Sequence, residues 1–356
     1  MTAISETELE HHLRHALLLH TDAQDCELAV ESSNRDGGGL VLNGKGGLVA
    51  AERILGSDLG FRRPILVDAS AYAGRRRRFA SDPFDRDWMR HQRRLGLPAV
   101  LPDAGYVAED DEDGLLSVLY RVHEEPQGTV ALLALHHSWT DPKHGQPTLK
   151  QHALAAGVPL ALVLEHPKDP MQVRRSVHGL VDLLDAAPST MLLRSDASAV
   201  GSLCYGAIAA AVGTRTGLRH LYPLGRRGGR KASIAVFVRS TMSYITLAKL
   251  DRAYQMDPDN DLWRCGCDVC ADADLSWVGS SPDPWQSAYL HSVEVLHQIR
   301  RDLFDNNLTP QQRRQAWIAQ CDSAIFRHDE LSELTDWEPP AYLGNWDSLR
   351  AREATA

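Results

Sequence analysis

The chain has 356 residues, of which 43% are hydrophobic and 24% charged, proportions that are ordinary for a globular protein. Its formal net charge of -9 excludes a surface that is basic throughout, so any contact with a polyanion must be local. No apolar run reaches about 18 residues, and acidic side chains interrupt the first apolar segment, so we expect neither a membrane span nor a cleavable leader. These features predict a cytoplasmic protein.

Residues 1–36 predict a polar leader that covers one end of a core. Residues 7–19 have the pattern of an amphipathic helix, with Leu13, Leu17 and Leu18 on one side. A polar stretch then runs to the glycines at 37–39.

Eight short apolar runs predict strands, and helix-period segments separate most of them. The runs cover residues 40–42, 65–67, 99–101, 130–135, 160–164, 191–193, 218–222 and 234–238. The expected helices cover residues 85–95, 114–124, 148–156, 170–184 and 200–212. Nearly continuous apolar strands alternating with helices are typical of a parallel sheet that is covered on both faces. The pattern predicts a (β/α)8 TIM-type barrel over residues 37–250 and 285–305.

An open doubly wound sheet is the competing fold. It would place a Gly-x-Gly-x-x-Gly turn after an early strand, and Gly44-x-Gly46-Gly47 has the wrong spacing. The connection after the seventh run is too short for a full helix. That place is either an irregular barrel segment or an error in the strand count.

Polar side chains close most of the apolar runs, and in a parallel barrel these ends meet at one mouth. The residues are Asp68, Asp103, His136, His137, Glu165, His166, Asp196, Arg239 and Ser240. Each one alone is compatible with a helix cap. Several carboxylates and imidazoles at one mouth must pair, titrate or bind a ligand, so the set predicts an active site.

The cysteines indicate a metal site. Three of the 6 cysteines, Cys265, Cys267 and Cys270, lie within six positions, and His291 follows on a predicted helix over residues 285–304. Three thiols and one imidazole form the ligand set of a structural Zn²⁺, which predicts a zinc-binding module over residues 251–291. His297 is the alternative histidine ligand. Reduced, partly buried thiols or a redox pair are the other interpretations.

The spacing Cys265-x-Cys267-x-x-Cys270, followed by Ser287-Ala288-Tyr289-Leu290-His291, resembles the zinc signature of the tRNA-guanine transglycosylase superfamily. The resemblance implies a barrel enzyme that exchanges a base in a polynucleotide. It also implies a base-side aspartate in the turn after an early strand, which Asp68 matches, and an aspartate that binds the incoming heterocycle, which Asp103 matches. Gly201-Ser202-Leu203 resembles the family's Gly-Gly-Leu turn, and residues 219–225 resemble its Arg-Tyr-Leu-Met-Gly-Val-Gly strand.

The chain departs from the family at the nucleophile. The family carries this aspartate in a Phe-Asp-Cys-Val-x-Pro-Thr-Arg segment, and the stretch matched to it, residues 235–241, has no carboxylate. Asp196 and Asp251 are the nearest replacements. We therefore expect Asp68 and Asp196 to be catalytic. The substrate-binding residues expected are Asp103, His136, His137, Gly201 and Ser202.

The expected function is that of a pentosyltransferase that replaces guanine by a 7-deazaguanine in DNA or tRNA. The nucleic acid would contact two arginine clusters, at residues 75–78 and 226–231. Two alternatives stay open: a non-catalytic or partner-dependent zinc-containing subunit, and an enzyme acting on a small 7-deazapurine nucleoside. A homodimer or a partner protein is also open. Residues 306–356 predict a helical C-terminal extension.

Overall fold

A computed structural model describes residues 6–57, 60–225, 233–332, 335 and 337–353 of the chain. The chain divides into two compact units, the first within residues 1–226 and the second within residues 227–356. Each unit buries its own set of apolar side chains, as a folding domain does. Within the described residues, no helix combines the length and apolar character needed to cross a bilayer.

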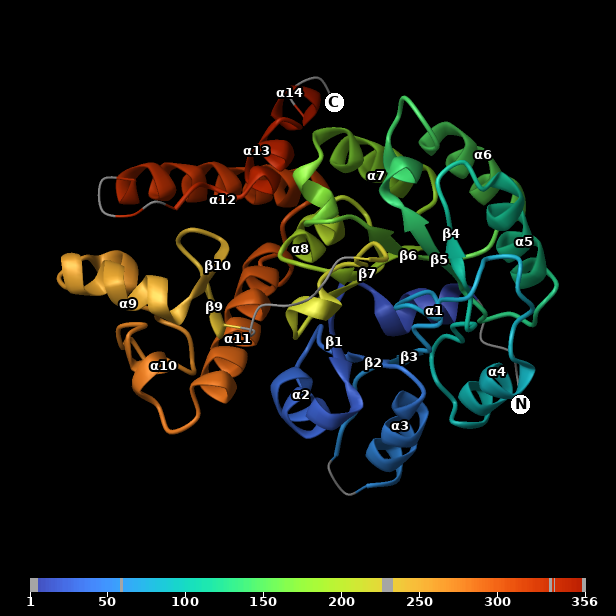
Figure 1. Ribbon diagram of the computed structural model, residues 1–356, viewed down its shortest axis with the longest axis horizontal. Coiled ribbons are helices and arrows are strands. Elements are labelled where there is room, and N and C mark those ends of the chain that lie inside the picture. Colours follow the sequence, from blue (N-terminus) through green and yellow to red (C-terminus); the bar gives the residue numbers. More distant parts are fainter. Residues whose placement is uncertain (1–5, 58–59, 226–232, 333–334, 336, 354–356) are drawn as a thin grey trace. The chain divides into compact units, whose positions relative to one another are not determined.

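The first unit is built on one sheet of eight parallel strands that curls on itself (Figure 1). In chain order the strands are β1 (Ala16–Asp22), β2 (Leu40–Asn43), β3 (Ile65–Asp68), β4 (Tyr106–Val107), β5 (Ala131–His136), β6 (Leu160–Glu165), β7 (Thr190–Ser195) and β8 (Ala209–Gly213). Their order in the sheet is β3-β2-β1-β8-β7-β6-β5-β4. Except for β3 and β4, which form the two edges, strands that follow one another in sequence are neighbours, and β8 pairs with β1, as in the strand order of a (β/α)8 barrel.

The sheet is not closed by direct pairing of β3 with β4 within the described residues. The segment that follows β3 bonds to the free edge of β4 instead. The backbone N–H of Tyr106 donates to the carbonyl of Arg78 at 2.8 Å, and the N–H of Ala80 donates to the carbonyl of Tyr106 at 3.1 Å. The predicted barrel is thus confirmed as a curled, eight-stranded parallel α/β sheet, and the closed barrel stays a prediction.

Helices connect the strands and cover the outside of the sheet (Figure 1). They are α1 (Glu6–Leu13), α2 (Cys26–Ser33), α3 (Gly46–Gly56), α4 (Arg86–Arg94), α5 (Glu112–His123), α6 (Gln146–Ala156), α7 (Arg174–Ala186) and α8 (Ser198–Cys204), with 3-10 turns η1 (Ala23–Asp25), η2 (His137–Thr140), η3 (Pro170–Gln172) and η4 (Thr216–Leu218). In α7, the fully buried side chains of Val177, Leu180 and Leu184 recur at helical spacing, which places one apolar face against the sheet.

Two strands of the sheet were expected to be helical. β1 lies inside the predicted leader, whose helix ends at Leu13, and β8 replaces the second half of the helix predicted over residues 200–212. Both predictions were wrong because the leucines of β1 also fit a helical period and the alanines of β8 favour helices intrinsically. Burial between neighbouring strands outweighs these local preferences, since β1 and β8 lie at the centre of the sheet.

Three of the eight predicted strands are not strands of this sheet. Residues 99–101 contribute only an isolated bridge between Val100 and Thr129, and residues 218–222 contribute only the bridge between Leu221 and Glu165. Residues 234–238 contain β9 (Ala235–Val238), which pairs antiparallel with β10 (Ser243–Thr246) in the second unit. The expected number of eight strands is nevertheless right, because three predicted strands are absent from the sheet and three others, β1, β8 and the short β4, were not predicted.

The second unit is mainly helical, which confirms the predicted helical C-terminus. Its helices are α9 (Leu247–Met256), α10 (Trp277–Ser280), α11 (Pro284–Phe304), α12 (Pro310–Leu331), α13 (Ala341–Asp347) and α14 (Arg350–Glu353), with the 3-10 turn η5 (Asp261–Trp263). Thr309 caps α12 through a reciprocal capping box with Gln312. The buried rings of Trp317 and Trp346 meet edge to face, 6.0 Å apart, and fasten α13 to α12.

Candidate active site and metal centre

The carboxyl ends of the strands gather the polar residues that the sequence singles out. Asp68 ends β3, and its carboxylate is fully buried. Its Oδ1 accepts a hydrogen bond from the backbone N–H of Ser70 at 2.7 Å, and its Oδ2 accepts one from the Tyr72 hydroxyl. The Nε2 atom of His20, on β1, lies 3.4 Å from Oδ2. A buried carboxylate requires such partners because an unpaired one costs several kcal/mol.

Arg194, on β7, supplies the positive charge beside Asp68. Its Nη1 lies 3.0 Å from Ser70 Oγ and 3.4 Å from the Tyr72 hydroxyl oxygen, and its Nη2 donates to the carbonyl of Gly217 at 2.7 Å. Burial by itself would raise the pKa of Asp68, but His20 and Arg194 hold that pKa below its ordinary value. Asp68 is therefore ionised at neutral pH.

Two residues of this network have strained backbones. Ser70 has φ of 53° and Arg194 has φ of 48°, both in the left-handed region that side chains other than glycine rarely adopt. The pairing of β7 with β8 also shifts register between Leu192 and Ser195, which places Arg194 in a bulge. Strain of this kind concentrates at functional sites, where the surrounding contacts enforce it.

Glu165, at the end of β6, forms a second buried ion pair. Its Oε1 accepts from Arg77 Nη1 at 2.6 Å, and its Oε2 accepts from the hydroxyl of Tyr106 on β4. The guanidinium of Arg77 also lies over the Tyr106 ring, 3.7 Å from its centroid. The three side chains link β4, β6 and the segment after β3 at the same edge of the sheet.

Asp103 lies just before β4 and remains slightly exposed, at 8%. Its Oδ2 accepts from Arg78, and its Oδ1 accepts from the backbone N–H of Asp85 at 2.7 Å. Burial raises the pKa of Asp103, although the bond from Asp85 and the charge of Arg78 oppose the shift. Asp103 is therefore a nearly buried acceptor that Arg78 and the backbone of Asp85 hold in place.

The histidines predicted at the end of β5 form a row of tilted and edge-to-face ring contacts with His166. The ring centroids of His136 and His137 are 4.4 Å apart, and those of His137 and His166 are 4.7 Å apart. His136 Nδ1 lies 2.8 Å from Ser138 Oγ and 3.9 Å from Glu109 Oε1. Burial and the neighbouring imidazoles lower the pKa of His137 to about 4, so this ring is neutral at physiological pH.

Asp169 and Asp196 form a coupled carboxyl pair that follows two neighbouring strands, β6 and β7. Asp169 Oδ1 accepts from the N–H of Met171, and Asp196 Oδ1 accepts from the N–H of Ala197, each at 2.9 Å. Burial and the charge of Asp196 raise the pKa of Asp169 to about 7. Burial also raises the pKa of Asp196, against the charge of Arg219. Such a pair keeps one proton in reserve near neutral pH.

Gly201 and Ser202 do not form the expected turn. Both are buried within α8, where the hydroxyl of Ser202 donates to the carbonyl of Ala199 at 2.7 Å. Asp251 lies exposed on α9 in the second unit and accepts from Gln255 Nε2 at 3.0 Å.

The sequence reasoning did not find His20, Tyr72, Tyr106, Asp169 or Arg194. His20 directly follows the apolar run Leu17–Leu19, so assigning this run to a strand would have placed His20 among the polar residues at strand ends.

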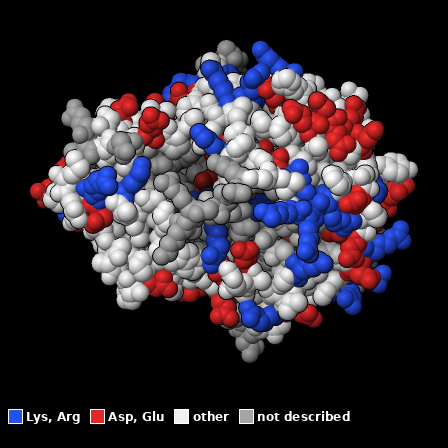
Figure 2. All heavy atoms as spheres, in the orientation of Figure 1, with Lys and Arg blue, Asp and Glu red and all other residues white. Residues whose placement is uncertain are grey.

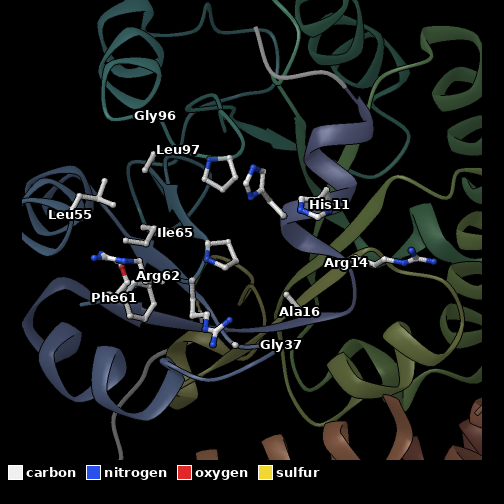
Figure 3. Close-up of a pocket in the computed structure, with 15 residues that line it drawn as sticks. His11, Arg14, Ala16, Gly37, Leu55, Phe61, Arg62, Ile65, Gly96 and Leu97 are labelled. Carbon is white, nitrogen blue, oxygen red and sulfur yellow. Dashed lines mark hydrogen bonds between the residues drawn. The ribbon is translucent and has the colours of Figure 1, made fainter. Parts of the chain in front are cut away.

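A cavity of about 540 Å³ lies at the opposite, amino-terminal edge of the sheet (Figure 3). Ala16, Gly37 and Ile65 contribute to its wall just before or at the start of three strands. Figure 3 shows Arg14 extending away from the other labelled side chains of this cavity. None of the predicted site residues lines it.

The predicted metal ligands come together in the second unit. The Sγ atoms of Cys265, Cys267 and Cys270 and a ring nitrogen of His291 lie within 4.8 Å of one another, and all four residues are buried. The Nδ1 atom of His291 is 3.8, 3.5 and 3.1 Å from the three sulfur atoms in that order. Tetrahedral bonds of zinc length place sulfur and nitrogen ligands about 3.5 Å apart, so the four residues fit one metal ion.

The surroundings of the cluster orient its ligands. Nε2 of His291 lies 2.8 Å from the carbonyl of Phe237 on β9, which assigns the ring proton to Nε2 and leaves Nδ1 for a metal. The indole N–H of Trp277 donates to Cys270 Sγ at 3.3 Å. All six cysteines are free thiols, and His297 lies outside the cluster, which favours His291 as the histidine ligand.

No family model, curated protein or solved structure matches the chain. The function must therefore be inferred from the two sites themselves.

We predict that Asp68→Asn lowers the free energy of unfolding by about 3 kcal/mol, because the buried guanidinium of Arg194 loses its counter-charge. Tyr72→Phe removes only one hydrogen bond to Asp68 and should cost about 1 kcal/mol. Denaturant titration of both variants measures the difference. Equal stability of Asp68→Asn and the wild type would show that the charge of Asp68 does not hold this edge together.

We predict that Asp169→Asn stabilises the protein above pH 7. A raised pKa means that the folded state favours protonated Asp169, so this group's stabilising contribution is present below about pH 4 and is lost as the pH rises to about 7. Asparagine keeps the cap on Met171 and carries no charge. The gain at pH 8 should be on the order of 1–2 kcal/mol and should vanish at pH 4. A gain that is equal at both pH values, measured by thermal melting, would contradict the raised pKa.

Proposed function

We propose that the chain is a base-exchange glycosyltransferase that replaces a guanine by a 7-deazaguanine in a nucleic acid. The observation that carries the proposal is the set of carboxyl groups that follow the strands of a parallel sheet, among them Asp196, next to the end of β7, and Asp169, after β6, whose pKa burial and the charge of Asp196 raise to about 7. Glycosidic bond exchange needs both an ionised carboxylate and a proton donor. The Cys265, Cys267, Cys270 and His291 cluster agrees with the zinc signature that the resemblance supplies.

The proposed first step uses the coupled pair. A carboxylate oxygen of Asp196 attacks the anomeric carbon, and the bond from that carbon to the purine nitrogen breaks. Protonated Asp169 gives its proton to the departing purine. A pKa of about 7 suits this role because the group both holds and releases a proton near neutral pH.

The proposed second step reverses the first with a different base. The nitrogen of the incoming 7-deazaguanine attacks the anomeric carbon, releases Asp196 and returns a proton to Asp169. The family resemblance matches Asp103 to the role of accepting hydrogen bonds from the heterocycle. Each of its oxygens already accepts one hydrogen bond, from Arg78 or Asp85, and keeps a second lone pair for the heterocycle. Asp68 would act as a fixed negative charge, because it is fully buried.

Two observations favour the alternative functions. Residues 235–241, the stretch matched to the family's nucleophile segment, have no carboxylate and begin with β9 of the second unit, which favours a non-catalytic subunit. Arg77 and Arg78 are bonded to Glu165 and Asp103 and are not free for phosphate groups, which favours a small nucleoside as substrate. The assay below separates all three functions.

The purified protein is incubated with radiolabelled guanine or 7-deazaguanine and with DNA, tRNA or free guanosine. We expect label to enter one polymer. Asp196→Asn and Asp103→Asn should lower its incorporation at least 100-fold, while Asp113→Asn, on the exposed first turn of α5, should leave it unchanged. Label in guanosine alone would favour the nucleoside enzyme, and label in none of the three would contradict base exchange.

We infer that the metal is zinc, because three thiolates and one imidazole at these separations suit its tetrahedral coordination. It would be held by Cys265, Cys267, Cys270 and His291 and would stabilise the second unit. Elemental analysis should find one zinc per chain in the wild type and in Cys204→Ala, whose thiol lies outside the cluster. Cys267→Ser should lose the metal. A folded wild-type protein without metal would contradict the assignment.

A further inference from the structure

One short segment carries a charge opposite to that of the chain. Residues 75–94 contain eight arginines and three aspartates, in a protein whose formal net charge is -9. The segment connects β3 to the residues before β4 and contains α4. Arginines in such a segment are solvated, have internal partners or are available to a polyanion outside the chain.

Internal partners account for three of the eight arginines. Arg77 pairs with Glu165 and Arg78 with Asp103, as described above. Arg93 pairs with Glu125, with Nη2 and Oε2 2.9 Å apart. These buried or half-buried pairs fix the position of the segment on the first unit.

The other arginines point outward. Arg75, Arg76, Arg86 and Arg94 are exposed, and none of them has an ion pair within the part of the chain that the structure describes. Arg90 is also exposed, and its partner at 2.9 Å is the equally exposed Asp87. Exposed pairs of this kind contribute little to stability, so Arg90 exchanges partners readily.

Lys45 extends this charge along α4. It precedes α3, and it lines a hollow of about 460 Å³ whose charged lining consists of Lys45, Arg90 and Arg94 together with Asp85 and Asp87. Lys45, Arg75, Arg76, Arg86, Arg90 and Arg94 are called the basic surface below. Figure 2 shows many lysine and arginine side chains on this face of the first unit, with acidic side chains beside them.

An exposed aromatic ring accompanies the basic surface. Phe79 is 65% exposed, although it follows four arginines directly. Its backbone is fixed, because its N–H donates to Asp82 Oδ2 at 3.0 Å and the residue bridges to Tyr106 of β4. A rigidly held, solvent-facing ring beside cations is the arrangement on which unpaired bases stack in proteins that bind single strands.

We propose that the basic surface and Phe79 bind an unpaired stretch of nucleic acid, with phosphate groups on the basic surface and one base stacked on Phe79. The inference rests on the proposed function, because it names the partner of the same edge of the sheet. The segment that carries most of the basic surface also reaches the proposed site. Arg77 contacts Glu165 and Arg78 contacts Asp103. The preceding residues, Arg75 and Arg76, are exposed. A strand on this surface is therefore held beside the proposed reaction centre. The second arginine cluster, residues 226–231, lies outside the described residues.

The test measures binding without catalysis. Fluorescence anisotropy measures the binding of a labelled 20-nucleotide single strand, and of the same sequence as a duplex, over a series of salt concentrations. Anionic phospholipid vesicles are then added as a competitor for the bound single strand. The variant replaces Arg75, Arg76, Arg86 and Arg94 by alanine. Its matched control replaces four other arginines, the exposed Arg174, Arg175 and Arg252 and the half-buried Arg327, and removes the same charge.

We expect the surface variant to bind the single strand at least 30-fold more weakly than the wild type. The slope of the logarithm of the binding constant against the logarithm of the salt concentration should fall in magnitude by about 3, since each of the four lost phosphate contacts removes about 0.7. Phe79→Ala should weaken single-strand binding roughly tenfold and leave duplex binding unchanged. The matched control should bind like the wild type. Thermal melting should show that all variants remain folded.

Equal loss in the matched control would overturn the proposal, because the effect would then be one of net charge. Unchanged binding by the surface variant, or displacement of the strand by vesicles at equal phosphate concentration, would overturn it as well. Asp196→Asn should bind the strand normally. If the wild type binds the strand but transfers no base, the proposed base exchange is wrong while the proposed binding surface is supported.

Discussion

The first unit depends on the pairing of charges at one edge of its sheet. Parallel strands end together, so the buried side chains of Asp68, Glu165 and Arg194 share a region from which water is largely excluded. Each charge is stable there only because another is within reach, and removal of one partner leaves the other uncompensated. The charge of Arg194 beside Asp68 and the ion pair of Glu165 with Arg77 therefore hold the loops of this edge in place.

The same edge separates side chains by their protonation state. His20 and Arg194 keep Asp68 ionised, while burial and the neighbouring Asp196 keep Asp169 partly protonated at neutral pH. Groups whose pKa values are driven apart in one place are the usual basis of acid and base assignments. In the second unit, His291 connects two elements. Its Nδ1 atom lies in the cysteine cluster and its Nε2 atom bonds to the carbonyl of Phe237, so it links α11 with β9.

Local sequence predicted the features that depend on neighbours in the chain. The spacing of three cysteines and the helical period of residues 285–304 were enough for the Cys265, Cys267, Cys270 and His291 cluster and for α11. β1 and β8 were missed because their leucines and alanines are also good helix formers, and only burial between strands distant in sequence makes them extended. Tyr106 and Asp169 were missed for the same reason, since their significance arises from Glu165 and Asp196, which folding brings near.

We propose that the reaction takes place at the carboxyl edge of the eight-stranded sheet. A crystal of the protein soaked with 7-deazaguanine would show where the base binds. We expect the heterocycle at this edge, with a ring N–H or amino group within hydrogen-bond distance of Asp103 and with Asp169 and Asp196 close to its glycosidic nitrogen. Density for the base in the cavity at the amino-terminal edge, with the carboxyl edge empty, would contradict it.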